Sequence, residues 1–301
     1  MQTGENLYTH RDENIFRTWG LMAVFLVLVI AVGFVVSYIY NNQNILYFAV
    51  IFAFLMNIIS YWNSDKIVLS MMHAKPITKG EYADLYNITE NLAITAGLPM
   101  PRLYLIEESS PNAFATGRNP SHGVICVTSG LVALLSKDEL EGVIAHEMSH
   151  IGNRDTLIST VAVILAGLIA IISDIALRSR FSSRNNDRGG GFIQILGIIF
   201  IILSPIAATL IRLAVSRKRE FLADATGALL TRYPEGLANA LKKIESQINQ
   251  KPFSSTSNAT AHLFIENPFG TKSLSGIGKL FMTHPPVAER VSALIGNRNN
   301  L

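Results

Sequence analysis

The stretch His146-Glu147-Met148-Ser149-His150 carries the residue types of a hydrolytic metal site. On a helix, residues four apart project from one face, so the two imidazoles can hold one Zn²⁺ ion together. The glutamate between them would face a water activated by the ion and serve as its general base. The alternative is an ordinary pair of core or surface histidines, and the scarcity of histidine, seven in 301 residues, argues against it.

The residues around this motif predict that it lies on a helix. Ser136-Lys137-Asp138-Glu139 has the pattern of a capping box, and apolar residues follow it at helical spacing. Gly152 and Asn153 come directly after the motif and indicate a helix end or a sharp bend. We therefore expect His146 and His150 in the last two turns of this helix.

A catalytic site of this kind needs a third protein ligand, with the fourth position of the metal left open. Glu220 is the candidate, on a second predicted helix. Asp224 lies one turn further along, where it could reach a ring nitrogen of a ligand histidine and fix its tautomer. This spacing alone also fits a solvated helix face, but beside the first motif it indicates a metal site.

The composition is that of a membrane protein. Hydrophobic residues make up 49% of the chain and charged residues only 16%, against about 25% charged residues in soluble domains. Residues 19–40 and 44–62 are uncharged and form a predicted helical hairpin, each long enough to cross a hydrocarbon core of about 30 Å. Two further apolar runs, 157–177 and 192–215, bracket the site, which predicts about four transmembrane helices.

The orientation of these spans follows mostly from their basic flanks. If all four runs cross, the following residues share one side: Arg11, Arg17, Lys66, Arg154, Arg217, Lys218 and Arg219. The positive-inside rule then places the amino terminus and the catalytic part in the cytosol. The loop 178–188 holds four arginines that would face outward, against that rule. Two interpretations stay open: full crossing, which the lengths favour, or a hairpin of the last two runs that packs against the catalytic part.

The net charge and the single cysteine bear on the expected partners and on the redox compartment of the protein. The net charge of +3 does not call for nucleic acid as a partner, because the basic residues gather at span ends, where anionic lipid head groups lie. Cys126 is the only cysteine, so the chain forms no internal disulfide and suits a reducing compartment. We expect it to be a buried apolar residue of a strand rather than a catalytic thiol.

The fold class predicted is α+β, mainly helical with a small β-sheet. We divide the chain into an amino-terminal tail and membrane hairpin (1–64), a first catalytic part with the metal helix (65–155), the third and fourth apolar segments (156–215) and a second catalytic part with the third ligand (216–301). The elements expected in the catalytic parts are a helix at 77–96, a strand at 102–107, a hairpin at 113–128 turning at 119–121, and helices at 217–230 and 235–247.

Taken together, the motifs resemble those of the HtpX-like membrane zinc endopeptidases, gluzincin relatives of the CAAX prenyl endopeptidase. The resemblance spans nearly the whole chain, with the motifs in the family's order. The residues that carry it are Asn112-Ala113-Phe114-Ala115-Thr116-Gly117, His146-Glu147-x-x-His150 with Ile151-x-Asn153, Ser216-Arg217-x-x-Glu220-Phe221-x-Ala223-Asp224, and Thr283-His284-Pro285-Pro286 with Arg290.

The resemblance implies one Zn²⁺ per chain, held by His146, His150 and Glu220, with Glu147 as general base. His284 is the candidate donor to the oxyanion of the tetrahedral intermediate, and Arg290 would orient it or the substrate. The alternative for His284 is a histidine that caps the turn before two prolines.

The resemblance also places a substrate-binding strand edge beside the metal, formed by Asn112, Ala113, Phe114 and Ala115. An exposed edge can bind an extended peptide as an added strand, through its backbone and with little dependence on sequence. The alternative is an ordinary turn into a core strand.

By resemblance, the chain is a multi-pass protease of the bacterial inner membrane that cuts misfolded membrane proteins on the cytosolic side. One alternative is the processing of a defined peptide or a lipidated tail. Another is a membrane scaffold or chaperone without turnover, against which the intact Glu147 argues. The bilayer and unfolded membrane proteins are the expected partners, and the oligomeric state stays open.

Overall fold

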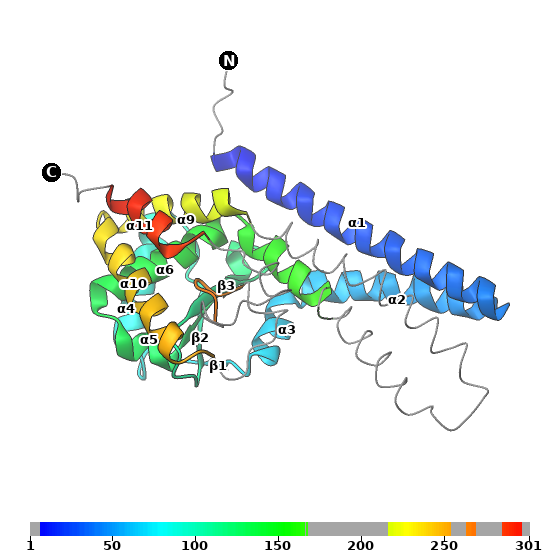
Figure 1. Ribbon diagram of the computed structural model, residues 1–301, viewed down its shortest axis with the longest axis horizontal. Coiled ribbons are helices and arrows are strands. Elements are labelled where there is room, and N and C mark those ends of the chain that lie inside the picture. The colour runs from blue at the N-terminus through cyan, green and yellow to red at the C-terminus, as the bar shows by residue number, and fades with distance from the viewer. Residues whose placement is uncertain (1–6, 166, 168–215, 254–262, 269–284, 297–301) are drawn as a thin grey trace, which may run out of the picture.

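The structure is a computed structural model, and it describes residues 7–165, 167, 216–253, 263–268 and 285–296. Two long helices, α1 (Leu7–Tyr40) and α2 (Gln43–Trp62), run side by side and extend away from a rounded catalytic part, as Figure 1 shows. Asn42 begins α2 by accepting a hydrogen bond from the backbone N–H of Asn44. The predicted helical hairpin is therefore confirmed.

Both helices are long and apolar enough to cross a membrane, by length and composition. Large apolar side chains lie exposed along them, which suits contact with lipid; among them are Val27, Phe34, Phe48 and Phe54. Of the third predicted span, the described part is the helix Asp155–Leu165, which packs against α1. Its remainder and the fourth span lie outside the described residues, so the described part of the chain holds two candidate spans.

A small mixed sheet lies behind the metal motif, with the strand order β1-β2-β4-β3. Its strands are β1 (Lys75–Pro76), β2 (Arg102–Ile106), β3 (Ala113–Thr116) and β4 (Val124–Thr128). β2 runs parallel to β4, whereas β3 and β4 form an antiparallel hairpin closed by a short 3₁₀ turn at Pro120–His122. The predicted hairpin and its turn are confirmed, and β3 forms one edge of the sheet.

Helix α6 (Lys137–Gly152) runs through the centre of the catalytic part, between β3 and the helices on its other side. Its apolar side chains Val143, Ile144 and Met148 are fully buried in the main core. The other helices of this part are α3 (Ser64–Met71), α4 (Ala83–Ala96), α5 (Ser129–Leu134), α9 (Arg217–Thr231), α10 (Pro234–Gln250) and α11 (Val287–Ile295).

The start of the helix expected at 77–96 is wrong by six residues, since α4 begins at Ala83. The backbone N–H of Ile77 bonds to the carbonyl of Leu103 and continues the pairing of β1 with β2. Thr78 then opens a turn in which its N–H and hydroxyl both donate to Glu81. Pairing with β2 and the turn at Thr78 therefore replace the helix that the sequence pattern predicts at residues 77–82. Helix α3 was not expected.

Cys126 lies on β4 and is fully buried, as expected. Burial raises the pKa of its thiol well above its ordinary value. A thiol in this setting stays protonated and behaves as a small apolar side chain.

Candidate metal centre

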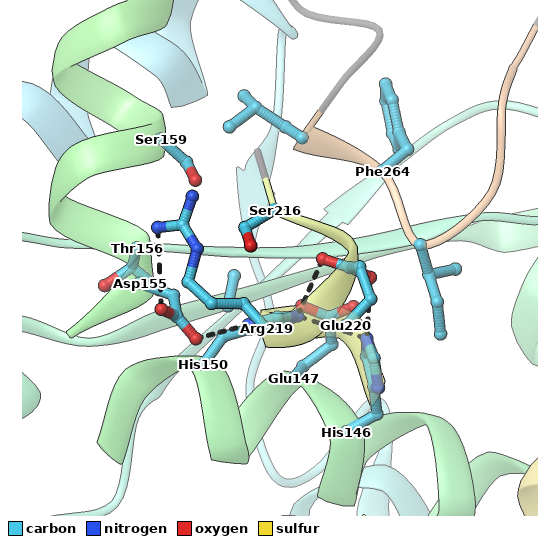
Figure 2. Close-up of a pocket in the computed structure, with 13 residues that line it drawn as sticks. His146, Glu147, His150, Asp155, Thr156, Ser159, Ser216, Arg219, Glu220 and Phe264 are labelled. Atoms are coloured by element: carbon cyan, nitrogen blue, oxygen red, sulfur yellow. Dashed lines mark hydrogen bonds and ion pairs between the residues drawn. The ribbon is translucent and has the colours of Figure 1, made fainter. Parts of the chain in front are cut away.

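The predicted metal motif lies on α6, which starts as the sequence indicates. The backbone N–H of Ser136 donates to Glu139 at 2.9 Å, and the helix ends at Gly152 with Asn153 as its C-cap. The motif does not face solvent, because His146 is fully buried and Glu147 is only 2% exposed. Figure 2 shows their side chains pointing from α6 into a pocket.

Helix α9 brings Glu220 to the open side of the two imidazoles. The Nε2 atoms of His146 and His150 lie 3.1 Å apart, and the carboxylate oxygens of Glu220 lie 3.8 Å and 3.7 Å from them respectively. Two ligand atoms at zinc distance from one tetrahedral ion are about 3.4 Å apart. The separations and the donor set of two nitrogens and one oxygen therefore fit one metal ion, which these three residues could hold.

This arrangement depends on a close approach between helices. A Cβ atom added at Gly227 of α9 would lie 3.0 Å from the backbone nitrogen of His146. On α6, a Cβ atom at Gly142 would lie 2.6 Å from the backbone nitrogen of Leu237, in α10. Glycine at these positions lets α9 and α10 lie against α6 backbone to backbone.

The outer nitrogen of His146 contacts a buried ion pair. Its Nδ1 atom lies 2.9 Å from Asp224, to which Arg290 donates from Nε at 2.9 Å and from Nη2 at 2.6 Å. Burial acts to raise the pKa of Asp224, but the charge and hydrogen bonds of Arg290 lower it to about 2. Burial lowers the pKa of His146 to about 4, against the opposing effect of Asp224. The contact leaves Nε2 of His146 directed at the metal position.

The outer nitrogen of His150 contacts a second carboxylate, Asp155, at 3.0 Å. Asn14 of α1 donates to Asp155 at 2.7 Å and to the carbonyl of Asn153 at 3.0 Å. Arg219 of α9 lies 3.7 Å from Asp155 and donates to the side-chain oxygen of Asn14 at 3.3 Å. The amino-terminal helix therefore takes part in the support of a candidate metal ligand.

The charges around His150 differ from those around His146. Burial acts to lower the pKa of His150, but the hydrogen bond to Asp155 and the charge of Glu220 outweigh it and raise the pKa to about 9.

Asp155 and Asn14 were not predicted as site residues. Asp155 is an acid placed directly after the bend at Gly152 and Asn153, which is a signal that could have found it. For Asn14, a polar residue at the start of an apolar helix, the sequence holds no comparable signal.

The remaining predicted residues are His284, Arg290 and those of the strand edge, 112–115. His284 lies outside the described residues. Arg290 is fully buried and reaches Asp224 rather than solvent. Ala115 of the predicted strand edge lines the metal pocket together with Glu147.

The strand edge is not exposed, contrary to expectation. Asn112, Ala113 and Phe114 are fully buried. The carbonyl of Ala113 accepts a hydrogen bond at 2.9 Å from the backbone N–H of Ile265, a residue of the carboxy-terminal part.

Residues 80–297 match the model of peptidase family M48. The protease HtpX homolog of Thermoanaerobacter pseudethanolicus is 45% identical over 96% of this chain and 97% of its own length. The protease HtpX homolog of Pyrococcus furiosus is 48% identical over 92% and 94% respectively. A crystal structure of S. mikatae Ste24p is similar with a TM-score of 0.48 and 21% identity, over 91% of this chain and 61% of that one.

Proposed function

From the premise that the chain belongs to peptidase family M48 and is a metalloendopeptidase, we propose that it cleaves misfolded or damaged membrane proteins on the cytosolic side of a bacterial inner membrane. The relatives also confirm the resemblance to HtpX-like enzymes. The observation that carries the proposal is the His146–His150–Glu220 donor set, in which His146 and Glu220 are buried, with Glu147 beside it in one pocket. That geometry supports hydrolysis by an activated water next to a metal ion.

Zinc is the metal that we propose for this site. His146 and His150 would hold it through Nε2 and Glu220 through its carboxylate, a donor set typical of catalytic zinc. When bound, zinc would polarise the scissile carbonyl and lower the pKa of a water at the open position. Asp224 and Asp155 would fix the two rings through their Nδ1 atoms.

Glu147 is the residue to which we assign proton transfer. It lines the same pocket as the proposed ligands, within the motif but outside the donor set. Its carboxylate would take a proton from the attacking water and pass it to the leaving amine. His284 keeps the proposed role of donor to the oxyanion, which would add about 3–4 kcal/mol of transition-state stabilisation.

The membrane assignment is supported by the two apolar helices. Arg17 lies in the amino-terminal part of α1 and Lys66 follows α2. These two helix ends lie next to the catalytic part in Figure 1. The positive-inside rule then favours a catalytic part in the cytosol, where it meets substrates at the membrane surface. A scaffold without turnover is the weaker candidate, because a binding-only metal site needs no carboxylate in the position of Glu147.

The test is cleavage of casein and of an unfolded membrane protein by the full-length enzyme in detergent, with and without added zinc. Glu147→Gln is the matched variant, since it replaces the base and touches no proposed ligand. We expect one zinc per chain in both proteins and a loss of cleavage of about 10²–10⁴-fold in the variant. Cleavage by Glu147→Gln at the wild-type rate would remove this residue from the mechanism.

A further inference from the structure

The outer edge of β3 is occupied by a segment of the chain itself, Leu263–Glu266. The backbone N–H of Ile265 donates to the carbonyl of Ala113 at 2.9 Å. The side-chain amide of Asn112 donates to the carbonyl of Glu266 at 2.9 Å, and its oxygen accepts from the N–H of Glu266 at 3.4 Å. Ala113 thus faces Ile265, and Asn112 faces Glu266, so the segment runs antiparallel to β3.

The opposite side of this segment is held by Arg290. Its Nη1 atom donates to the carbonyl of Ile265 at 3.0 Å, while its other nitrogens bind Asp224. The N–H and C=O groups of both Ile265 and Glu266 therefore have partners, and each of these bonds is made to the backbone of the segment. Bonds to the backbone can hold a peptide with little dependence on its sequence; here one comes from the backbone of β3 and the others come from the side chains of Asn112 and Arg290.

The segment also reaches the metal pocket. Leu263, Phe264 and Ile265 line it together with Ala115 and Glu147. Phe264 is fully buried, with its ring 5.4 Å from that of Phe114 in edge-to-face geometry and 5.0 Å from that of Phe253. The segment thus borders the same pocket as the proposed catalytic residues, and Figure 2 shows Phe264 on the side of this pocket away from His146 and Glu147.

We propose that this segment, residues 263–266, occupies the substrate groove as an internal pseudosubstrate. The inference rests on the proposed function and adds the direction and contacts of the substrate. A substrate peptide binds antiparallel to β3, with backbone contacts to Ala113, Asn112 and Arg290. It places a large apolar side chain where Phe264 lies.

Two consequences follow for the enzyme. The preferred substrates are extended peptides that carry an aromatic or large aliphatic residue, which unfolded transmembrane segments supply in abundance. Turnover also requires the internal segment to leave the groove, so this segment sets the fraction of enzyme open to substrate.

The test uses a labelled peptide with the sequence of the segment, acetyl-Leu-Phe-Ile-Glu-amide, and measures its binding by fluorescence anisotropy. The protein is full-length Glu147→Gln loaded with zinc, so that binding is measured without cleavage. The matched control is the same peptide methylated on the isoleucine nitrogen, which removes the hydrogen bond to Ala113. We expect saturable binding of the first peptide and binding about tenfold weaker for the second.

A variant pair distinguishes a pseudosubstrate from a fixed strand that completes the sheet. Phe264→Ala weakens the internal competitor, whereas Phe25→Ala removes a buried ring from the separate cluster between α1 and the helix Asp155–Leu165. We expect the peptide to bind several-fold more tightly to Phe264→Ala and no more tightly to Phe25→Ala.

Absent binding of the peptide, or equal binding of its methylated form, would overturn the inference whatever the variants do. Cleavage of casein by the wild type is measured in parallel. Casein cleavage without peptide binding refutes the pseudosubstrate alone, and its absence refutes the proposed function.

Discussion

The two candidate histidine ligands are supported by two different regions of the molecule. Each ring contacts a carboxylate through Nδ1, at 2.9 Å for His146 and 3.0 Å for His150. Behind His146, Asp224 is locked by the fully buried Arg290, in the catalytic part. Behind His150, Asp155 is held by Asn14 from the first long apolar helix. One support is internal to the catalytic helices, and the other comes from the membrane anchor.

The charges of the two supports differ as well. Arg290 neutralises Asp224, and the buried ring of His146 has a pKa lowered to about 4. His150 faces several carboxylates, which raise its pKa to about 9 although burial opposes them. Similar contacts at Nδ1 therefore occur in environments of different charge. Removing each support should therefore have different consequences.

The largest effect is expected from Asp224→Ala. The substitution leaves Arg290 charged and unpaired in the core, which costs about 3–5 kcal/mol of unfolding free energy. The variant should lose both zinc and thermal stability, measured by metal analysis and by unfolding monitored with circular dichroism. If its stability fell no further than that of Asp155→Ala, the claimed difference between the two supports would be wrong.

Glu220→Ala removes the third proposed ligand, whose carboxylate lies close to both imidazoles. We expect it to release most of the zinc and to abolish cleavage, while Asp224 and Arg290 keep the fold intact. Metal content after gel filtration and the unfolding temperature together check this expectation. Full zinc occupancy in this variant would mean that the third ligand lies elsewhere.

Asp155→Ala acts on the support of His150 alone. We expect zinc affinity to fall by about 10–100-fold, as typically follows the loss of a carboxylate behind a ligand histidine. Titration against a chelator of known affinity measures the change. Asp155→Asn is the control, because it keeps a hydrogen-bond acceptor of the same shape and should fall between the wild type and Asp155→Ala.

Asn14→Ala should give the smallest decrease in zinc affinity, and it tests directly whether α1 contributes to the metal site. Loss of one hydrogen bond to Asp155 predicts a decrease of roughly 2–10-fold in zinc affinity. Thr18→Ala is the matched control, since Thr18 is buried one turn along α1 and bonds only to the carbonyl of Asn14 among the described contacts. Equal affinities in the two variants would exclude α1 from the metal site.

The parts that the sequence predicts well are those that depend on local spacing. A helix places residues four apart on one face, so His146 and His150 could be assigned to one face from the sequence alone. The same holds for the pair Glu220 and Asp224.

The parts that the sequence does not predict depend on tertiary contacts. Asn14 is 141 residues from Asp155 along the chain, and no periodicity records their contact. Asp155 is placed by the chain reversal after α6, where Arg154 adopts a positive φ of 62°. The segment 263–266 likewise contacts β3 through a bond between Asn112 and Glu266, which are 154 residues apart in the chain.

The two glycines where α6 meets α9 and α10 bear on how this protein could be engineered. Replacing a helical glycine by alanine is a standard way to gain stability, worth about 1 kcal/mol at an unobstructed position. At Gly227 and Gly142 the added methyl group would meet the backbone of the neighbouring helix at 3.0 Å and 2.6 Å. A library built to raise thermostability should therefore exclude both positions, since a gain in helix propensity there would displace the helix that carries the metal ligands.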